Sequence, residues 1–122
     1  MTAVSGAIGI RDLSIDFIGH AGSVHAVRNV SLEIGGAEIL GLVGESGSGK
    51  STVALSLLGL LAPNARVLSG TMTLDGKTRN LAESGALRPL RGRDIAMVFQ
   101  DPVASLNPVF TIGTHLDEVL RR

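Results

Sequence analysis

Residues 44–52 read Gly44-Glu45-Ser46-Gly47-Ser48-Gly49-Lys50-Ser51-Thr52 and directly follow the apolar run 39–43. This stretch fits the pattern G-x-x-x-x-G-K-[ST]. In that pattern the backbone N–H groups of a tight, glycine-permitted turn point at phosphate oxygens, and a helix begins on the far side of the turn. The stretch therefore predicts a nucleotide phosphate loop between a strand and a helix.

Two side chains of the predicted loop are candidates for direct ligand contact. Lys50 would reach the outer phosphates as a point charge, and the Ser51 hydroxyl would hold one corner of a Mg²⁺ shell. The apolar run 53–61 is compatible with the following helix, and Pro63-Asn64 would end it. A flexible Gly/Ser linker is the alternative, although linkers seldom lie between a strand and a helix this apolar. A dinucleotide-binding fingerprint fits less well, because Thr52 stands where its third glycine is needed.

Composition limits the class of protein. The 122 residues include no cysteine and 44% hydrophobic residues, with a formal net charge of zero, as expected for at most one soluble globular domain. The lack of cysteine excludes a disulfide framework and a thiolate metal site, and the balanced charge argues against nucleic acid as the main ligand. The longest apolar stretch is shorter than the roughly 20 residues that span a bilayer, and the amino terminus does not resemble a secretory signal. We therefore expect a cytoplasmic location, with membrane contact only through partners.

Several stretches have strand patterns. Residues 8–18 and 24–34 alternate weakly, which predicts two antiparallel strands, and 69–76 predicts a short strand that rejoins them. The runs 39–43 and 95–99 do not alternate, which predicts strands buried on both faces of a mostly parallel sheet. The expected fold class is therefore α/β, with a small antiparallel sheet beside the nucleotide-binding core.

The segments after the third strand are polar or amphipathic. The arginines of 77–94 are interpreted as a solvated face, because scattered surface charge is the common case. Thr111 is expected to cap a helix. The apolar stripe of that helix would consist of Ile112, Leu116, Val119 and Leu120.

Gln100 ends the second apolar run and opens 101–110, a two-proline segment that cannot be regular helix or central strand. A side-chain amide at the carboxyl end of a strand lies in the crevice where open α/β sheets bind ligands. There it could ligate the same Mg²⁺ and orient a water molecule. A loop glutamine bonded to nearby backbone is the alternative.

Together, residues 44–52, the string Met97-Val98-Phe99-Gln100-Asp101-Pro102 and the string Ser105-Leu106-Asn107-Pro108 resemble the ATP-binding subunits of ABC transporters. The resemblance extends over 26–39 and 90–95, and the last string is most similar to the oligopeptide, dipeptide and nickel importer branch. It implies an ABC-type P-loop NTPase core, incomplete in this chain, with an antiparallel β subdomain and the start of a helical subdomain.

The resemblance also implies roles for individual residues. Gln100 would be the glutamine of the Q-loop (100–110), which contacts Mg²⁺ and water and relays the nucleotide state to the membrane subunits. Phe17 stands about where the family places an adenine-stacking aromatic, with His25 as a competing candidate and a core role for Phe17 as a further alternative. ATP would then be bound by residues 44–52 and Phe17, with Ser51 and Gln100 on Mg²⁺ and with Lys50 and Gln100 in the catalytic machinery.

An assembly follows from the same resemblance. The parent subunit would hydrolyse ATP to import peptides or similar small solutes at the inner face of the cell membrane. Its partners would be a second ATP-binding subunit, two membrane permease subunits and an extracytoplasmic solute-binding protein, and the amphipathic helix after Thr111 would face permease helices or pack within its own domain. A non-catalytic nucleotide-binding or interaction module, and an ABC-type ATPase outside transport, remain as alternatives.

Three elements that the family places after the Q-loop do not occur in the sequence: an LSGGQ-type segment, an apolar strand ending in Asp-Glu, and a switch histidine. His115 follows the Q-loop closely and is interpreted as a surface or interface histidine. We therefore expect residues 1–122 to be the amino-terminal part of one ABC-type ATP-binding domain. Such a chain would bind nucleotide with negligible turnover and would expose apolar surface at 39–43 and 95–99.

Overall fold

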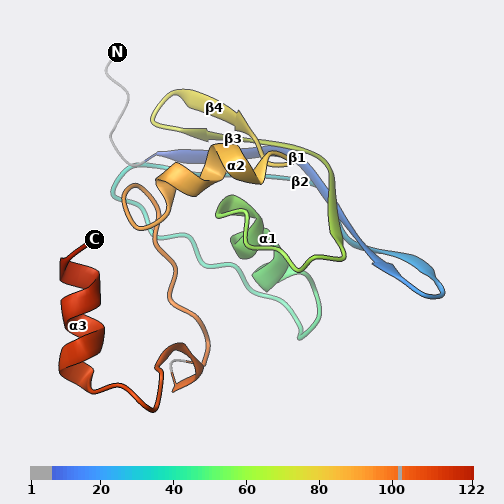
Figure 1. Ribbon diagram of the computed structural model, residues 1–122. Coiled ribbons are helices and arrows are strands. Elements are labelled where there is room, and N and C mark those ends of the chain that lie inside the picture. The colour runs from blue at the N-terminus through green and yellow to red at the C-terminus, as the bar shows by residue number, and fades with distance from the viewer. Residues whose placement is uncertain (1–6, 102) are drawn as a thin grey trace.

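The computed structural model describes residues 7–101 and 103–122, and it contains one antiparallel sheet with two helices on the same side of it (Figure 1). The strands are β1 (Ile8–Gly19), β2 (Gly22–Ile34), β3 (Ala65–Leu74) and β4 (Lys77–Asn80). The helices are α1 (Lys50–Leu57), α2 (Ser84–Leu87) and α3 (Ile112–Leu120), with 3-10 turns η1 (Arg88–Leu90) and η2 (Val103–Ser105).

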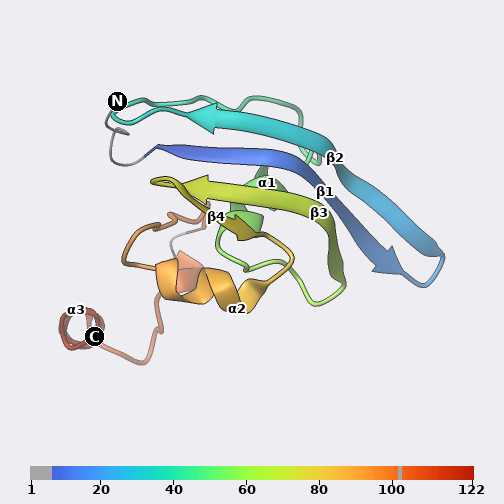
Figure 2. The same ribbon diagram turned by 90° about the horizontal axis from the view of Figure 1, so that it is seen from above.

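The sheet confirms the predicted antiparallel strands. Its spatial order is β2-β1-β3-β4, which can be followed from above in Figure 2. β1 and β2 form the hairpin expected from 8–18 and 24–34. β3 pairs with the other edge of β1, as expected for 69–76, although it already begins at Ala65. The short edge strand β4 was missed, because its four polar residues carry no hydrophobic alternation.

The core lies on the face of the sheet that α1 and α2 cover. Ile10, Leu13, Ile15 and Met72 are at most 1% exposed there. Helix α1 adds Val53, and the segment of α2 and η1 adds Leu87 and Leu90. Gly70 permits this packing, because it has a φ of +138° and a Cβ at this position would lie 2.8 Å from Leu13 Cδ1.

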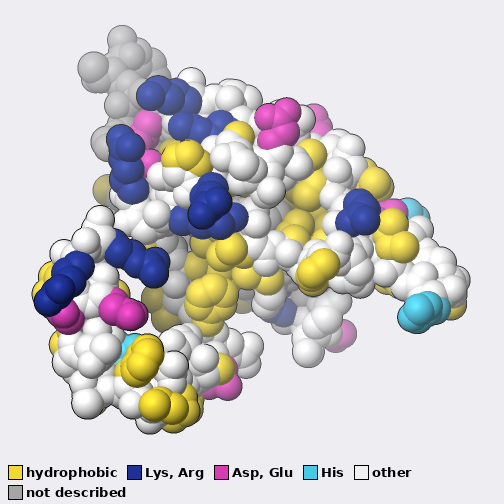
Figure 3. Space-filling model, in the orientation of Figure 1, with side chains coloured by type: hydrophobic (Ala, Val, Ile, Leu, Met, Phe, Trp, Pro, Cys, Tyr) yellow, Lys and Arg dark blue, Asp and Glu magenta, His cyan; other side chains and the backbone are white. Residues whose placement is uncertain are grey.

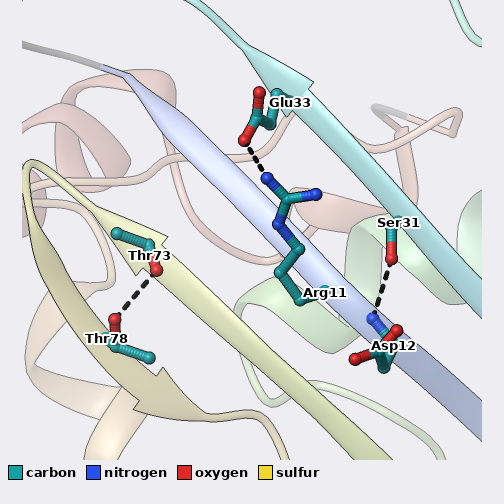
Figure 4. A network of polar contacts seen from close by, with 6 residues as sticks. All are labelled: Arg11, Asp12, Ser31, Glu33, Thr73 and Thr78. Carbon is teal, nitrogen blue, oxygen red and sulfur yellow. Dashed lines mark hydrogen bonds and ion pairs between the residues drawn. The ribbon is translucent and has the colours of Figure 1, made fainter.

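Polar contacts tie neighbouring strands together on exposed parts of the sheet (Figure 4). Arg11 on β1 forms an ion pair with Glu33 on β2, and the Asp12 N–H donates to Ser31 Oγ at 2.9 Å. The hydroxyls of Thr73 and Thr78 join β3 to β4 at 2.9 Å. These contacts agree with the strand register, which the buried hydrophobic face sets, and exposed ion pairs of this kind contribute little to stability.

The two apolar runs do not form the predicted buried strands. Residues 39–43 and 95–99 have no strand assignment, and the second run forms only an isolated bridge between Arg91 and Ile95. A strand needs hydrogen-bonding neighbours along its length, and the described residues offer none to 39–43 and only that single parallel bridge to 95–99. The expected exposure of apolar surface is confirmed, because Ile39 is 98% and Val98 94% exposed.

The interpretation of the arginines in 77–94 as a solvated face is wrong for Arg91. Its half-buried guanidinium donates from Nε to Leu58 O at 2.6 Å and from Nη2 to Gly59 O at 3.0 Å. Gly59 has a φ of +63°, which ends α1 before the predicted stop at Pro63-Asn64. Arg91 therefore supplies donors and positive charge to the carboxyl-terminal end of α1.

Helix α3 confirms the predicted cap. Thr111 Oγ1 accepts a hydrogen bond from Thr114 N at 3.2 Å. The expected apolar stripe is exposed rather than packed within the described part of the domain, with values of 74% for Ile112, 61% for Leu116, 72% for Val119 and 85% for Leu120. The helix stands apart from the sheet in Figures 1 and 2. None of the helices in the described ranges is long and apolar enough to cross a membrane.

Replacing Arg91 tests its contact with α1. We expect Arg91→Met to lower the free energy of unfolding by about 1–3 kcal/mol, because the buried carbonyl of Leu58 loses its donor. Urea denaturation measures this change, and Arg88→Met is the matched control because Arg88 is exposed. The control should stay within about 0.5 kcal/mol of the parent protein. Equal effects of the two substitutions would contradict the assignment.

Candidate functional site

The predicted phosphate loop adopts a turn that depends on glycine. Gly47 and Gly49 have φ values of +81° and +97°, and Ser48 N donates to Glu45 O at 3.1 Å to close the turn. Gly49 also lies against β2, because a Cβ on it would come within 2.8 Å of the Ala26 carbonyl oxygen. The loop is thus seated on the sheet by a close backbone approach that only glycine allows.

Lys50 extends along this loop as its first helical residue. Its ammonium donates to Gly44 O at 2.6 Å and to Glu45 O at 2.7 Å, and it reaches Ser48 Oγ at 3.2 Å. These three acceptors are oxygen atoms, the kind of acceptor that a phosphate group presents. The charge of Lys50 is therefore held at the loop itself rather than directed into bulk solvent.

Helix α1 begins at the same place and adds backbone donors. The Val53 N–H donates to Gly49 O at 3.0 Å and so forms the first intrahelical bond. The N–H groups of residues 50–52 consequently have no acceptor within α1. Free N–H groups and the positive end of the helix dipole favour an anion at this position.

A cleft of about 630 Å³ opens in front of the loop. It is lined by residues 46–52, by Gln100, and by Phe17, Val24, His25 and Ala26 of the β1–β2 hairpin. Its volume is in the usual range for small-molecule and cofactor sites. The structure therefore brings the loop, Gln100 and both aromatic candidates to one cleft. Gly44 and Glu45 lie outside this lining and contribute the carbonyl groups that hold Lys50.

Phe17 and His25 lie on different faces of the hairpin. The pairing of β1 with β3 is regular from Ile15 to Phe17, so Phe17 shares the core face with the fully buried Ile15. His25 is paired opposite Asp16, and its Nδ1 lies 2.5 Å from Asp16 Oδ1. The geometry thus places Phe17 on the side of α1 and ties the His25 ring to a carboxylate of the neighbouring strand.

Gln100 also lines the cleft. It is exposed, and the loop after it is ordered by local hydrogen bonds, in which Asp101 Oδ1 accepts from Val103 N at 3.1 Å. Asn107 Oδ1 accepts from Val109 N at 3.0 Å further along, and Pro102 of the same loop lies outside the described residues. His115 also belongs to this local network, because its Nε2 lies 3.2 Å from Asn107 O.

Three residues at this site were not predicted from the sequence. Val24 and Ala26 line the cleft, but apolar residues in a strand carry no sequence signal that separates a cleft wall from a core position. Asp16 is 8% exposed, and an acidic residue within an alternating strand is a signal that could have indicated a paired carboxylate.

Comparison with known proteins agrees with this geometry. The family profile described as ABC transporter matches residues 27–120. The chain belongs to the ABC transporter family. That match includes the phosphate loop and Gln100 and begins inside β2, so the coarse expectation of an ABC-type nucleotide-binding domain holds.

Individual relatives in the ABC transporter family carry names of import ATP-binding proteins. A protein of Brucella abortus (strain 2308) with the provisional name peptide import ATP-binding protein is 46% identical over 92% of this chain and 34% of its own length. The dipeptide transport ATP-binding protein DppD of Bacillus subtilis (strain 168) is 40% identical over 94% of this chain and 35% of its own. The glutathione import ATP-binding protein GsiA of Salmonella typhimurium is 44% identical over 93% of this chain and 19% of its own. The chain therefore spans about a third or less of these relatives.

Substitution of Gly49 tests how the loop is seated. We expect Gly49→Ala to lower the free energy of unfolding by roughly 1–3 kcal/mol, because the positive φ is strained and the Cβ meets the Ala26 carbonyl. Gly41→Ala is the matched control, since a Cβ there meets no atom within 4 Å. Denaturant unfolding of both variants measures the difference. An unchanged stability of Gly49→Ala would show that the loop does not lie against β2 in this way.

Proposed function

We propose that this chain binds Mg-ATP as part of the ATP-binding subunit of an ABC importer. The observation that carries the proposal is that residues 46–52, Phe17 and Gln100 line the same cleft. Membership of the ABC transporter family and the names of the relatives support the same nucleotide. The cleft offers hydrogen-bond donors for the phosphates, oxygen ligands for the metal ion and an aromatic ring for the base.

The phosphate groups would be bound by the loop and by α1. Lys50 supplies the ammonium, and the N–H groups of residues 47–51 supply donors at the positive end of the helix, the Ser48 N–H being shared with Glu45 O. A bound phosphate would take over the role that the carbonyls of Gly44 and Glu45 have for the ammonium. Phosphoryl transfer depends mostly on positioning and electrostatics, so these groups would also lower the energy of the developing charge.

Ser51 and Gln100 are the residues that would hold magnesium. Both line the cleft, and their hydroxyl and amide oxygens suit a hard cation that keeps several water ligands. When bound, the ion neutralises phosphate charge. Gln100 would in addition orient a water molecule, because its side chain lines the same cleft.

Phe17 is the better candidate for stacking against the adenine. It lies on the core face of the hairpin, the side on which α1 and the loop lie, whereas the His25 ring is bound to Asp16. An aromatic ring stacked on a base contributes about 0.5–1.5 kcal/mol beyond its buried area.

Efficient hydrolysis requires a group that this cleft lacks. None of its described lining residues carries a carboxylate that could orient the attacking water. We therefore propose that the 122-residue chain binds ATP with negligible turnover. The same observation favours a second candidate function, a non-catalytic nucleotide-binding or interaction module.

The proposal extends to the assembly of the parent subunit. Peptides or similar small solutes are the proposed cargo, supported by the relatives named for peptide, dipeptide and glutathione import. The partners would be a second ATP-binding subunit, two permease subunits and a solute-binding protein at the inner face of the membrane. The exposed apolar stripe of α3 offers a surface for such helical partners. An ABC-type ATPase outside transport would lack permease partners.

Titration of Mg-ATP tests the central claim. We expect Lys50→Ala to weaken binding at least tenfold in isothermal calorimetry, because a hydrogen bond to a charged group contributes about 1.5–3 kcal/mol. Arg88→Ala is the matched control, since Arg88 is exposed and lies outside the cleft. Circular dichroism confirms that each variant is folded. If folded Lys50→Ala binds Mg-ATP as tightly as the parent protein, the phosphate site is wrong.

A comparison of two ligands tests the role of Phe17. We expect Phe17→Leu to weaken ATP binding by about 0.5–1.5 kcal/mol and to leave the affinity for inorganic tripolyphosphate unchanged, because only ATP has a base to stack. Phe110→Leu serves as the control, because Phe110 lies outside the cleft beside His115. Equal losses for ATP and tripolyphosphate would instead assign Phe17 to the core.

A further inference from the structure

A second cleft, of about 260 Å³, lies at the other edge of the sheet. The phosphate loop contacts edge strand β2, whereas this cleft lies between edge strand β4 and the segment that follows η1. Its polar lining includes Lys77, Arg79 and Arg93. Figure 3 shows basic side chains gathered on this part of the surface, over β4 and α2. Neither the comparisons nor the proposed ATP site assigns a role to these residues.

Arg79 points inward from β4. It is paired directly opposite Met72 of β3, which is fully buried, so the two side chains share the core face of the sheet. Arg79 Nη1 is buried and has no hydrogen-bond partner among the described residues. A buried guanidinium nitrogen without an acceptor is costly, and native structures rarely leave one in that state.

The carboxylates near this cleft do not satisfy Arg79 Nη1. Asp75 and Asp94 both line the cleft, but neither accepts a hydrogen bond from that nitrogen. Asp94 Oδ2 instead lies 3.9 Å from Arg93 Nε. The three cations of the lining exceed its two carboxylates, which leaves a positive site with one buried donor.

We propose that this cleft binds a small tetrahedral oxyanion, either inorganic phosphate or a phosphomonoester. Arg79 Nη1, which has no water-accessible surface in the free protein, would turn into the cleft to donate to the anion. Lys77 and Arg93, which lie at the solvent side, would neutralise the remaining charge. Donors from three separate side chains suit an anion with more than two oxygens better than a carboxylate. Leu74, Pro89 and Leu90 form an apolar wall that strengthens these electrostatic contacts.

The test separates this cleft from the phosphate loop by using Lys50→Ala as the background. Inorganic phosphate is titrated while the unfolding midpoint is measured, because a ligand that binds only the folded state stabilises it. We expect phosphate to raise the midpoint of Lys50→Ala, and the addition of Arg79→Met to weaken this effect at least tenfold. Arg88→Met is the matched control, since it removes the same charge at an exposed position outside the cleft.

Arg79→Met also leads to a prediction that needs no ligand. Arg79→Met should raise the unfolding midpoint in phosphate-free buffer, because it replaces a half-buried guanidinium, whose buried Nη1 has no partner among the described residues, with an apolar side chain of similar length. A lower midpoint would show that Arg79 has a structural partner, such as an ordered water molecule, and would overturn the proposal. An equal phosphate effect with and without Arg79 would do the same.

A spectroscopic measurement needs no substitution of Arg79. The Nε–Hε resonance of Arg79 should shift during the phosphate titration of Lys50→Ala and also during a sulfate titration, since sulfate has the same shape. Acetate should bind at least tenfold more weakly. An unmoved resonance, or acetate binding as tight as phosphate, would overturn the assignment of a tetrahedral oxyanion. None of these outcomes depends on ATP, so they leave the proposed function unaffected.

Discussion

The close approach of Gly49 to the Ala26 carbonyl is the contact on which the rest of the site depends. It seats the turn before α1 directly on β2, and β2 is joined to β1 through a long hairpin. As a result, the positive end of α1 and Phe17 of that hairpin share one cleft, although Phe17 and Lys50 are 33 positions apart in the sequence. A single absent Cβ thereby couples a local turn to the geometry of the whole binding site.

Local signals in the sequence predicted the parts of the structure that local physics determines. The phosphate loop, the cap at Thr111 and the hairpin of β1 and β2 depend on turn glycines, a capping hydroxyl and alternation within a few residues. The runs 39–43 and 95–99 were not predicted correctly, because a buried strand also needs neighbours that the described residues do not provide. Gln100 was expected beside the loop from its position after an apolar run as well as from family resemblance, whereas Phe17 was expected there from the resemblance alone.

Two arginines of 77–94 show why the burial and hydrogen-bond partners of a charged side chain are hard to predict from sequence. Arg91 is half-buried and donates to two carbonyls at the end of α1, so its desolvation is offset by charge-assisted hydrogen bonds. Arg79 is turned inward by its register opposite Met72, and its Nη1 has no such acceptor in the described chain. The sequence, whose net charge is zero, holds no signal that distinguishes Arg79 from Arg91. Strand register and helix ends, which are tertiary features, decide which arginine is satisfied.

The exposed run 39–43 has a consequence for how this chain behaves in a crowded solution. Its residues are apolar, uncharged and free of proline, and Ile39 and Val43 are more than nine-tenths exposed. Extended segments with these properties are templates for edge-to-edge association between chains. Chaperones that recognise unfolded apolar stretches would compete for the same segment during synthesis, so the yield of monomer should depend on how quickly this run becomes covered.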